Sequence, residues 1–255
     1  ELPVNEDGVV QADDLKQLIA SKRPALVSVM AANNESGALQ PWREIAAMCR
    51  EQGVPFHTDA AQWIGKLDAT SLGECEFITG SAHKFGGPQG IGALIFRETL
   101  TFPKFMHGGG QEKRQRAGTE SVAAIAGFGV AAKMAAPQLD DYRAHCAALQ
   151  TRFETGLKMI ANDIVIVGDA APRVPNTSNV LLPGISAETQ LMAMDLEGVS
   201  VSSGSACSSG AFKPSHVMAA MGYSDNDARS ALRFSWGWDS KASDIDAALA
   251  AYDKM

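Results

Sequence analysis

The fold is decided by three successive stretches: Ala25-Leu26-Val27-Ser28-Val29-Met30, the amphipathic segment Trp42–Glu51, and Val54-Pro55-Phe56-His57-Thr58. Two apolar runs separated by a helical segment predict two parallel strands joined by a right-handed crossover. Two further runs, Cys75-Glu76-Phe77-Ile78-Thr79 and Ile91-Gly92-Ala93-Leu94-Ile95-Phe96, extend the sheet. We therefore expect an α/β fold, a mainly parallel sheet flanked by helices, with its ligand crevice at the carboxyl ends of the strands.

The second half of the chain predicts a smaller α+β domain. Residues 121–136 carry small and apolar side chains at helical spacing, and this pattern stops at Pro137. We place the boundary there, which divides the chain into domains 1–136 and 137–255. The following segments are expected to be a helix to about residue 160, strands near 164–167, 177–182 and 232–236, a short strand before Ser203, and helices at 187–197 and from 243.

Composition narrows the class of function. The 255 residues are 45% hydrophobic and 20% charged, which is typical of a globular protein, and the net charge of -7 argues against nucleic-acid or membrane partners. No apolar stretch approaches the roughly 20 residues that span a bilayer. The four cysteines are scattered without a Cys-x-x-Cys pair, so we predict neither disulfides nor a metal site, and a reducing cytoplasm.

Two side chains at predicted strand ends indicate a carbonyl cofactor. Lys84 lies in Ser81-Ala82-His83-Lys84-Phe85-Gly86-Gly87-Pro88-Gln89-Gly90, where its amine can form a Schiff base or remain a solvated loop lysine. Asp59 closes the strand before it; its carboxylate can pair with the ring nitrogen of pyridoxal phosphate or cap a helix. Gln62 can reach the ring oxygen. Lys84 follows Asp59 by 84 − 59 = 25 residues, about one crossover and a strand, so both can share one crevice.

Cys207 is the candidate nucleophile. Serine and glycine flank it on both sides, which favours an accessible thiol over a buried inert one. Cys49 and Cys146 fall in predicted helices and Cys75 opens a short strand, so these three are expected to be structural.

Six motifs together resemble the cysteine desulfurases. They follow one another in the same order from Val27 to Gly237: Asn33-Asn34-Glu35-Ser36-Gly37, His57-Thr58-Asp59-Ala60-Ala61-Gln62, the Lys84 turn, His107-Gly108-Gly109-Gly110-Gln111-Glu112, Ala117-Gly118-Thr119-Glu120, and Ser202-Ser203-Gly204-Ser205-Ala206-Cys207-Ser208-Ser209-Gly210. The resemblance implies fold type I of the pyridoxal-phosphate enzymes and a homodimer. Residues 1–136 would be the C-terminal part of the large cofactor domain, and residues 137–255 the small domain that carries the cysteine loop.

The resemblance also implies a role for each site residue. Lys84 would hold pyridoxal 5'-phosphate covalently and Asp59 its ring nitrogen, Gln62 and Asn34 would contact the ring oxygen or the substrate, and Arg233 the substrate carboxylate. Ser81 and His83 would bind the phosphate, and Thr119 would reach the phosphate of the partner subunit. His83 or the substrate itself would accept the proton of Cys207. Two alternatives stay open: Asn34 could only shape a turn, and Arg233 could belong to a surface salt bridge.

The reaction implied is removal of sulfur from L-cysteine to give L-alanine and a persulfide on Cys207, for a sulfur acceptor such as an iron-sulfur scaffold. The family's glycine-threonine turn and stacking histidine do not precede these motifs here, so we expect a truncated chain that binds the cofactor weakly or not at all. The alternatives are a selenocysteine lyase or aminotransferase of the same fold, and a non-catalytic domain that docks a scaffold.

Overall fold

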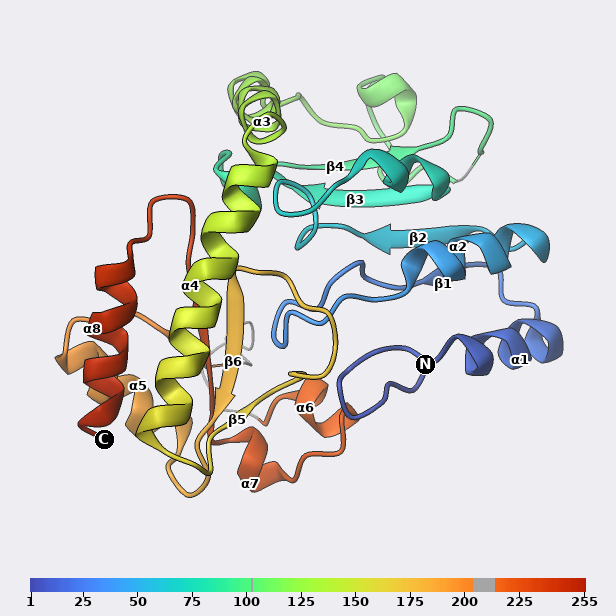
Figure 1. Cartoon of the computed structure of the whole chain (residues 1–255). Helices are drawn as coiled ribbons and strands as arrows, with labels where there is room; N and C mark the ends of the chain where they lie inside the picture. Colours follow the sequence, from blue (N-terminus) through green and yellow to red (C-terminus); the bar gives the residue numbers. More distant parts are fainter. Residues whose placement is uncertain (102, 204–213) are drawn as a thin grey trace. The chain divides into compact units, whose positions relative to one another are not determined.

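The chain divides into two compact units (Figure 1). The computed structural model describes residues 1–101, 103–203 and 214–255. Unit 1 consists of Glu1–Ser21, Ala32–Pro41 and Asp140–Met255, and unit 2 of Lys22–Ala31 and Trp42–Leu139. The change of unit after Leu139 lies close to the sequence boundary at Pro137, whereas residues 1–21 and 32–41 group with the C-terminal residues.

Side-chain and backbone contacts between distant segments accompany that grouping. The amide of Gln40 donates to the carbonyl of Gly8 at 2.8 Å and accepts from the backbone N–H of Val10 at 2.9 Å. Ala38 forms an antiparallel bridge with Arg173. These contacts join segments that are far apart in sequence, and hydrophobic periodicity carries no information about them. The boundary predicted after residue 136 therefore lies near the change of unit at Leu139. It does not account for residues 1–21 and 32–41, which belong to unit 1.

Unit 2 is built on a four-stranded sheet in the order β1-β2-β3-β4. β1, β2 and β3 are parallel, and β4 runs antiparallel to β3. Their bounds are Val27–Ser28, Phe56–Asp59, Phe77–Ser81 and Gly92–Phe96. The regular part of β1 is shorter than the apolar run at residues 25–30, although Val29 and Ala31 continue the hydrogen bonding by donating to the carbonyls of His57 and Asp59.

In unit 2, α2 (Trp42–Glu51) packs against strand β2, and α3 (Val122–Ala135) contacts the turn η2 (Ala82–Phe85). α2 matches the sequence prediction and buries Trp42, Ile45, Ala46 and Cys49. Its apolar residues recur three and four apart, so they fall on one face. Like η2, the remaining elements η1 (Thr70–Glu74) and η3 (Glu112–Arg114) are 3₁₀ turns.

Unit 1 carries an antiparallel sheet in the order β5-β6-β8-β7. The strands are β5 (Val165–Ile166), β6 (Thr177–Leu181), β8 (Ala231–Ser235) and β7 (Ser202–Ser203). The helices are α1 (Ala12–Lys22), α4 (Leu139–Ile160), α5 (Ala187–Leu196), α6 (His216–Ala220), α7 (Asp225–Ala228) and α8 (Ala242–Asp253). This α+β arrangement agrees with the pattern of short strands and helices predicted beyond residue 137.

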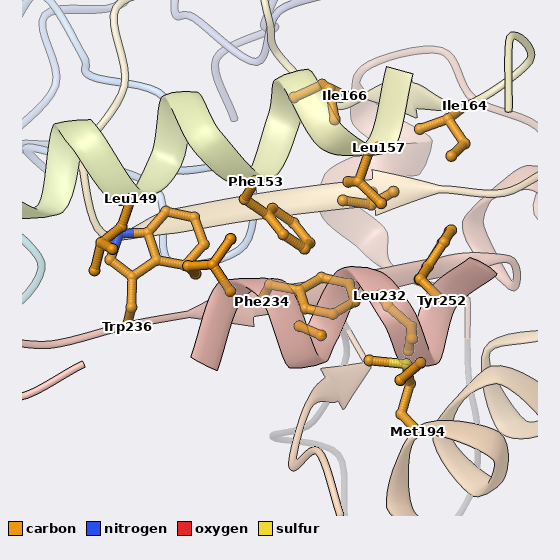
Figure 2. Close-up of a cluster of buried hydrophobic side chains, with 14 of the residues drawn as sticks. Leu149, Phe153, Leu157, Ile164, Ile166, Met194, Leu232, Phe234, Trp236 and Tyr252 are labelled. Carbon is orange, nitrogen blue, oxygen red and sulfur yellow. The ribbon is translucent and has the colours of Figure 1, made fainter. Parts of the chain in front are cut away.

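The core of unit 1 lies between α4, α8 and the sheet (Figures 1 and 2). Figure 2 shows Phe153 of α4 pointing at Phe234 of β8, and their ring centroids are 4.6 Å apart. Trp236 closes one end of the cluster and donates from its indole N–H to the carbonyls of Cys146 and Pro175. The aromatic cluster thereby fixes β8, the strand that carries Arg233.

Among the described residues no single helix is long and apolar enough to cross a membrane. In the described part of the chain, one bent pair of consecutive helices, α3 and α4, passes that test of length and composition when the two are taken together.

Candidate active site

Asp59 and Ser81 end two neighbouring parallel strands of unit 2, and Lys84 follows in η2. The register pairs Asp59 of β2 with Thr79 of β3, so Ser81 lies two residues further toward the same edge of the sheet. The carboxylate of Asp59 is exposed and accepts from the backbone N–H of Ala61 at 2.9 Å. The structure therefore brings the predicted carboxylate and the predicted amine to the carboxyl ends of adjacent strands.

The turn that carries Lys84 is held from both sides while Lys84 itself is exposed. Ala82 before it is fully buried. Phe85 after it packs on Phe128 of α3, with ring centroids 5.6 Å apart. Gly86 ends the turn with φ +87°, a conformation that favours glycine, and its N–H donates to the carbonyl of Ala82. The amine thus projects from a fixed backbone, which is what a cofactor anchor requires. His83 is exposed on the same turn.

Gln62 follows Asp59 in a helical turn and contacts a buried lysine. The ammonium Nζ of Lys66 donates to Oε1 of Gln62 at 2.5 Å. Lys66 is only 5% exposed. The turn is closed by backbone bonds to the carbonyl of Ala60 from Trp63 and Ile64. The amide of Gln62 is therefore oriented by a neighbour one helical turn later.

His57 lies on the same strand face as Asp59 and is held by the strands on either side. Its Nδ1 is 2.7 Å from Oγ of Ser28 on β1, and its Nε2 is 3.2 Å from Oγ1 of Thr79 on β3. Burial lowers the pKa of His57, and the carboxylate of Asp59 opposes part of that shift. A neutral imidazole suits two hydroxyl partners, since each ring nitrogen has one. Both ring nitrogens of His57 thus have a hydroxyl partner within the sheet.

The groups at this edge fit pyridoxal phosphate by their chemistry. The ring nitrogen needs a carboxylate, the aldehyde an amine and the ring oxygen a hydrogen-bond donor, and the phosphate needs hydroxyl or imidazole donors. Asp59, Lys84 and Gln62 meet the first three needs, and Ser81 with His83 the last. All five belong to unit 2, where Asp59 and Ser81 end β2 and β3 and the other three follow one of these strands.

Arg233 belongs to unit 1, and its guanidinium is oriented by two neutral oxygens. Nη1 donates to the backbone carbonyl of Asn34 at 2.9 Å, and Nη2 donates to Oγ of Ser202 at 3.3 Å. Ser202 faces Arg233 across the β7–β8 pair. Within the ranges that the structure describes, Arg233 makes no ion pair, so it is not part of a surface salt bridge there. A half-buried guanidinium without a carboxylate partner suits a carboxylate ligand.

The turn at residues 33–37 is shaped by Asn33. Its Oδ1 accepts from the backbone N–H groups of Glu35 at 2.8 Å and Ser36 at 3.0 Å. The side chain of Asn34 has no part in these two bonds, which weakens the turn-shaping alternative for that residue. Next to it, Glu35 is 4% exposed and its carboxylate accepts from the hydroxyl of Ser215 at 2.5 Å.

Burial raises the pKa of Glu35, while the bond from Ser215 and the charges of His216 and Arg233 pull it down. The raised pKa reflects the cost of removing a carboxylate from water. Glu35 joins the turn that holds Asn34 to Ser215, the N-cap residue of α6. Sequence reasoning missed Glu35, Ser202 and Lys66, because their contacts span strands or distant segments; only the four-residue spacing of Gln62 and Lys66 could have been noticed.

Three of the cysteines are buried in the structure, as the sequence predicted. Burial raises the pKa of the Cys49 and Cys75 thiols to about 11, with a further rise from Glu76, so both are poor nucleophiles. Cys146 is fully buried in α4. Cys207 lies outside the described residues, so its role stays a prediction. Thr119 is exposed in an irregular segment of unit 2.

A sheet with parallel strands whose carboxyl ends present a lysine, an aspartate and an amide is typical of the fold-type-I, pyridoxal-phosphate-dependent class of α/β proteins. The family model for aminotransferase class-V matches residues 1–248. The chain belongs to the class-V aminotransferase family, whose members depend on pyridoxal phosphate.

Relatives and solved structures agree with this placement. The cysteine desulfurase IscS of Clostridium botulinum is 38% identical over 257 residues, which cover 100% of this chain and 64% of the relative. A NifS-like protein from Rickettsia africae superposes with a TM-score of 0.90 at 35% identity, over 99% of this chain and 68% of that one. The structure of SspA in complex with cysteine superposes with a TM-score of 0.75 at 29% identity, over 92% of this chain and 65% of that one. The chain thus spans about 64% of the length of the curated relative.

Proposed function

We propose that this chain is the catalytic part of a cysteine desulfurase, which transfers the sulfur of L-cysteine to Cys207 and releases L-alanine. The observation that carries the proposal is the carboxylate of Asp59 and the amine of Lys84 at the ends of neighbouring strands. Relatives named cysteine desulfurases and a neighbour solved with cysteine support the substrate. In the overall change the Cβ–S bond of the substrate breaks, an S–S bond to Cys207 forms, and hydrogen replaces sulfur on Cβ.

Each residue has a defined task in this proposal. When bound, pyridoxal phosphate supplies an electron sink for the substrate electrons. Lys84 holds it covalently through Nζ, Asp59 keeps the ring nitrogen protonated, and Ser81 with His83 and the partner's equivalent of Thr119 bind the phosphate. The amine Nζ of Lys84 would also be the group that accepts the proton from Cα of the substrate.

Substrate binding falls to the residues of unit 1 in this proposal. Arg233 binds the substrate carboxylate with its planar fork, because both of its hydrogen-bond acceptors in the described residues are neutral oxygens. Asn34 contacts the bound substrate or the ring oxygen. Cys207 takes the sulfur as a thiolate, and His83 or the substrate itself accepts its proton.

The test of this function uses the full-length protein incubated with L-cysteine. We expect release of alanine and a Cys207-containing peptide that is heavier by one sulfur atom in mass spectrometry. Cys207→Ser should abolish the persulfide and sulfide release, and Lys84→Ala should abolish both together with covalent cofactor. Cys207→Ser with undiminished sulfide release would instead indicate a lyase or aminotransferase that does not use this thiol. No persulfide and no alanine would favour the scaffold-docking alternative.

Partners and location are part of the same proposal. We propose a homodimer that hands sulfur to an acceptor protein such as an iron-sulfur scaffold, in the cytoplasm. α3 supports the dimer, because Val122, Ile125, Val130 and Met134 are exposed apolar residues on it. The free thiols of Cys49, Cys75 and Cys146 fit a reducing compartment. Light scattering of the full-length protein measures the dimer directly; a monomer at micromolar concentration would contradict it.

A further inference from the structure

The contact between Lys66 and Gln62 bears on how the cofactor ring is recognised. Gln62 is a primary amide, and its two ends differ in chemistry: Oε1 only accepts hydrogen bonds, and Nε2 only donates them. A ring oxygen that carries negative charge needs the donor end. Nothing in the sequence near Gln62 says which end faces Asp59 and the strand edge, since the amide can rotate by half a turn at little cost.

The structure removes that ambiguity. The ammonium of Lys66 has three donors and no acceptor, so the atom of Gln62 that meets it at 2.5 Å must be Oε1. This assignment rests on the chemistry of the lysine. Lys66 is only 5% exposed, so water has little access to its ammonium group. Losing the acceptor Oε1 would therefore cost free energy, because a buried charge would lose a hydrogen-bond partner.

We propose that Lys66 is a positioning residue: it holds Oε1 of Gln62 and thereby presents the Nε2 amide as the donor to the ring oxygen of the cofactor. Lys66 touches neither cofactor nor substrate in this arrangement. Without it the amide rotates, and for part of the time its carbonyl oxygen opposes the negative ring oxygen. The inference rests on the proposed cofactor site and adds the residue that sets its polarity.

Binding of two probes by full-length, cofactor-free protein tests the proposal. Pyridoxal phosphate contains the ring oxygen, and 3-deoxypyridoxal phosphate lacks it. We expect Lys66→Met to weaken binding of pyridoxal phosphate roughly ten- to hundredfold, the range for one hydrogen bond to a charged group, and to leave binding of the deoxy probe unchanged. Lys66→Arg, which keeps the donor, should restore most of the affinity. Equal weakening for both probes would overturn the proposal, because a merely structural role does not depend on the ring oxygen.

A double-mutant cycle separates Lys66 from Gln62. Gln62→Ala is expected to weaken pyridoxal phosphate binding by a similar factor, and adding Lys66→Met should cause no further loss. Additive losses would show that Lys66 does not act through Gln62. Lys16→Met in α1 is the matched control at an exposed lysine. If Lys66→Met does not fold, Lys66→Leu serves, since it also removes the hydrogen-bond donor.

A final readout needs no cofactor. In ¹⁵N-labelled cofactor-free protein the side-chain amide signals of Gln62 should shift in Lys66→Met and stay in place in Lys16→Met. Unchanged Gln62 signals would overturn the positioning role. If wild-type protein bound neither probe, the proposed function would fail, whereas the amide signals would still decide whether Lys66 orients Gln62.

Discussion

Asp59 shows how one residue at a strand end can determine the chemistry of a site. Its carboxylate is anchored by the N–H of Ala61 and points away from the face that buries Phe56 and Thr58. Alternation along the strand places His57 on the same face as Asp59. The position of this pair could be predicted from sequence, because the strand period is two. The hydroxyl partners of His57 could not, because they come from other strands.

At the residue scale we predict that Asp59→Asn weakens pyridoxal phosphate binding about 10- to 100-fold, the range for losing one charge-assisted hydrogen bond. The asparagine still has an oxygen that can accept from the N–H of Ala61, so the strand end is preserved. Absorbance titration of full-length cofactor-free protein measures the change. Asp13→Asn, at an exposed position of α1, is the control and should bind like wild type. Unaltered affinity in Asp59→Asn would show that the ring nitrogen does not meet this carboxylate.

At the element scale, the 3₁₀ turn η2 depends on a glycine distant from it in sequence. Gly65 has φ +77°, and a Cβ built there would lie 2.4 Å from Cβ of Phe85, the residue after Lys84. Glycine is therefore required at this position both for backbone conformation and for close approach. The sequence shows a glycine in a turn, but only the tertiary structure shows which side chain occupies the space beside it.

Gly65→Ala should lower the free energy of unfolding by about 2–4 kcal/mol, from left-handed strain plus overpacking against Phe85. Gly53→Ala is the matched control: its φ is +65°, but nothing lies within 4 Å of the added Cβ. It should cost only about 1 kcal/mol, the strain alone. Chemical denaturation measures both. Similar losses in the two variants would contradict the packing of Phe85 against Gly65.

The helix α4 gives a second prediction at this scale. Phe153 is fully buried against Phe234 and Trp236 (Figure 2). Phe153→Ala should lower the free energy of unfolding by about 3–5 kcal/mol, because the protein loses the buried apolar surface of the ring and also gains a cavity. Met159→Ala, on the same helix and 83% exposed, should change it by less than about 0.5 kcal/mol. Denaturant unfolding compares the two; a small loss in Phe153→Ala would mean that the cluster can collapse around the gap.

At the scale of the whole molecule, Glu35 links stability to pH. Burial raises the pKa of Glu35 above its ordinary value of 4.5. Between pH 4.5 and the higher pKa of the folded state, Glu35 is protonated in the folded protein but ionised in the unfolded chain. The contribution of Glu35 to stability is therefore fully present below pH 4.5 and is lost as the pH rises through the folded pKa.

Glu35→Gln removes this titration. We therefore expect the difference in unfolding free energy between variant and wild type to move in favour of the variant as pH rises from the mid-acidic range toward neutrality. Urea denaturation at several pH values gives that difference. Glu44→Gln, exposed on α2, should run parallel to wild type. If the Glu35→Gln profile also ran parallel, the carboxyl of Glu35 would titrate alike in the folded and unfolded chain.

The sequence by itself determined the strand–helix–strand pattern, the α+β second half and the positions of Asp59, Lys84 and Arg233, because periodicity and turn residues act over a few neighbouring residues. The tertiary structure decided which groups meet across distance. The hydroxyl of Ser215 reaches Glu35 180 residues away, Ser202 and the carbonyl of Asn34 orient Arg233, and residues 1–21 and 32–41 join the C-terminal unit. Such contacts form only when burial brings separate segments together, since a hydrogen bond or ion pair between them gains little while both partners remain in water.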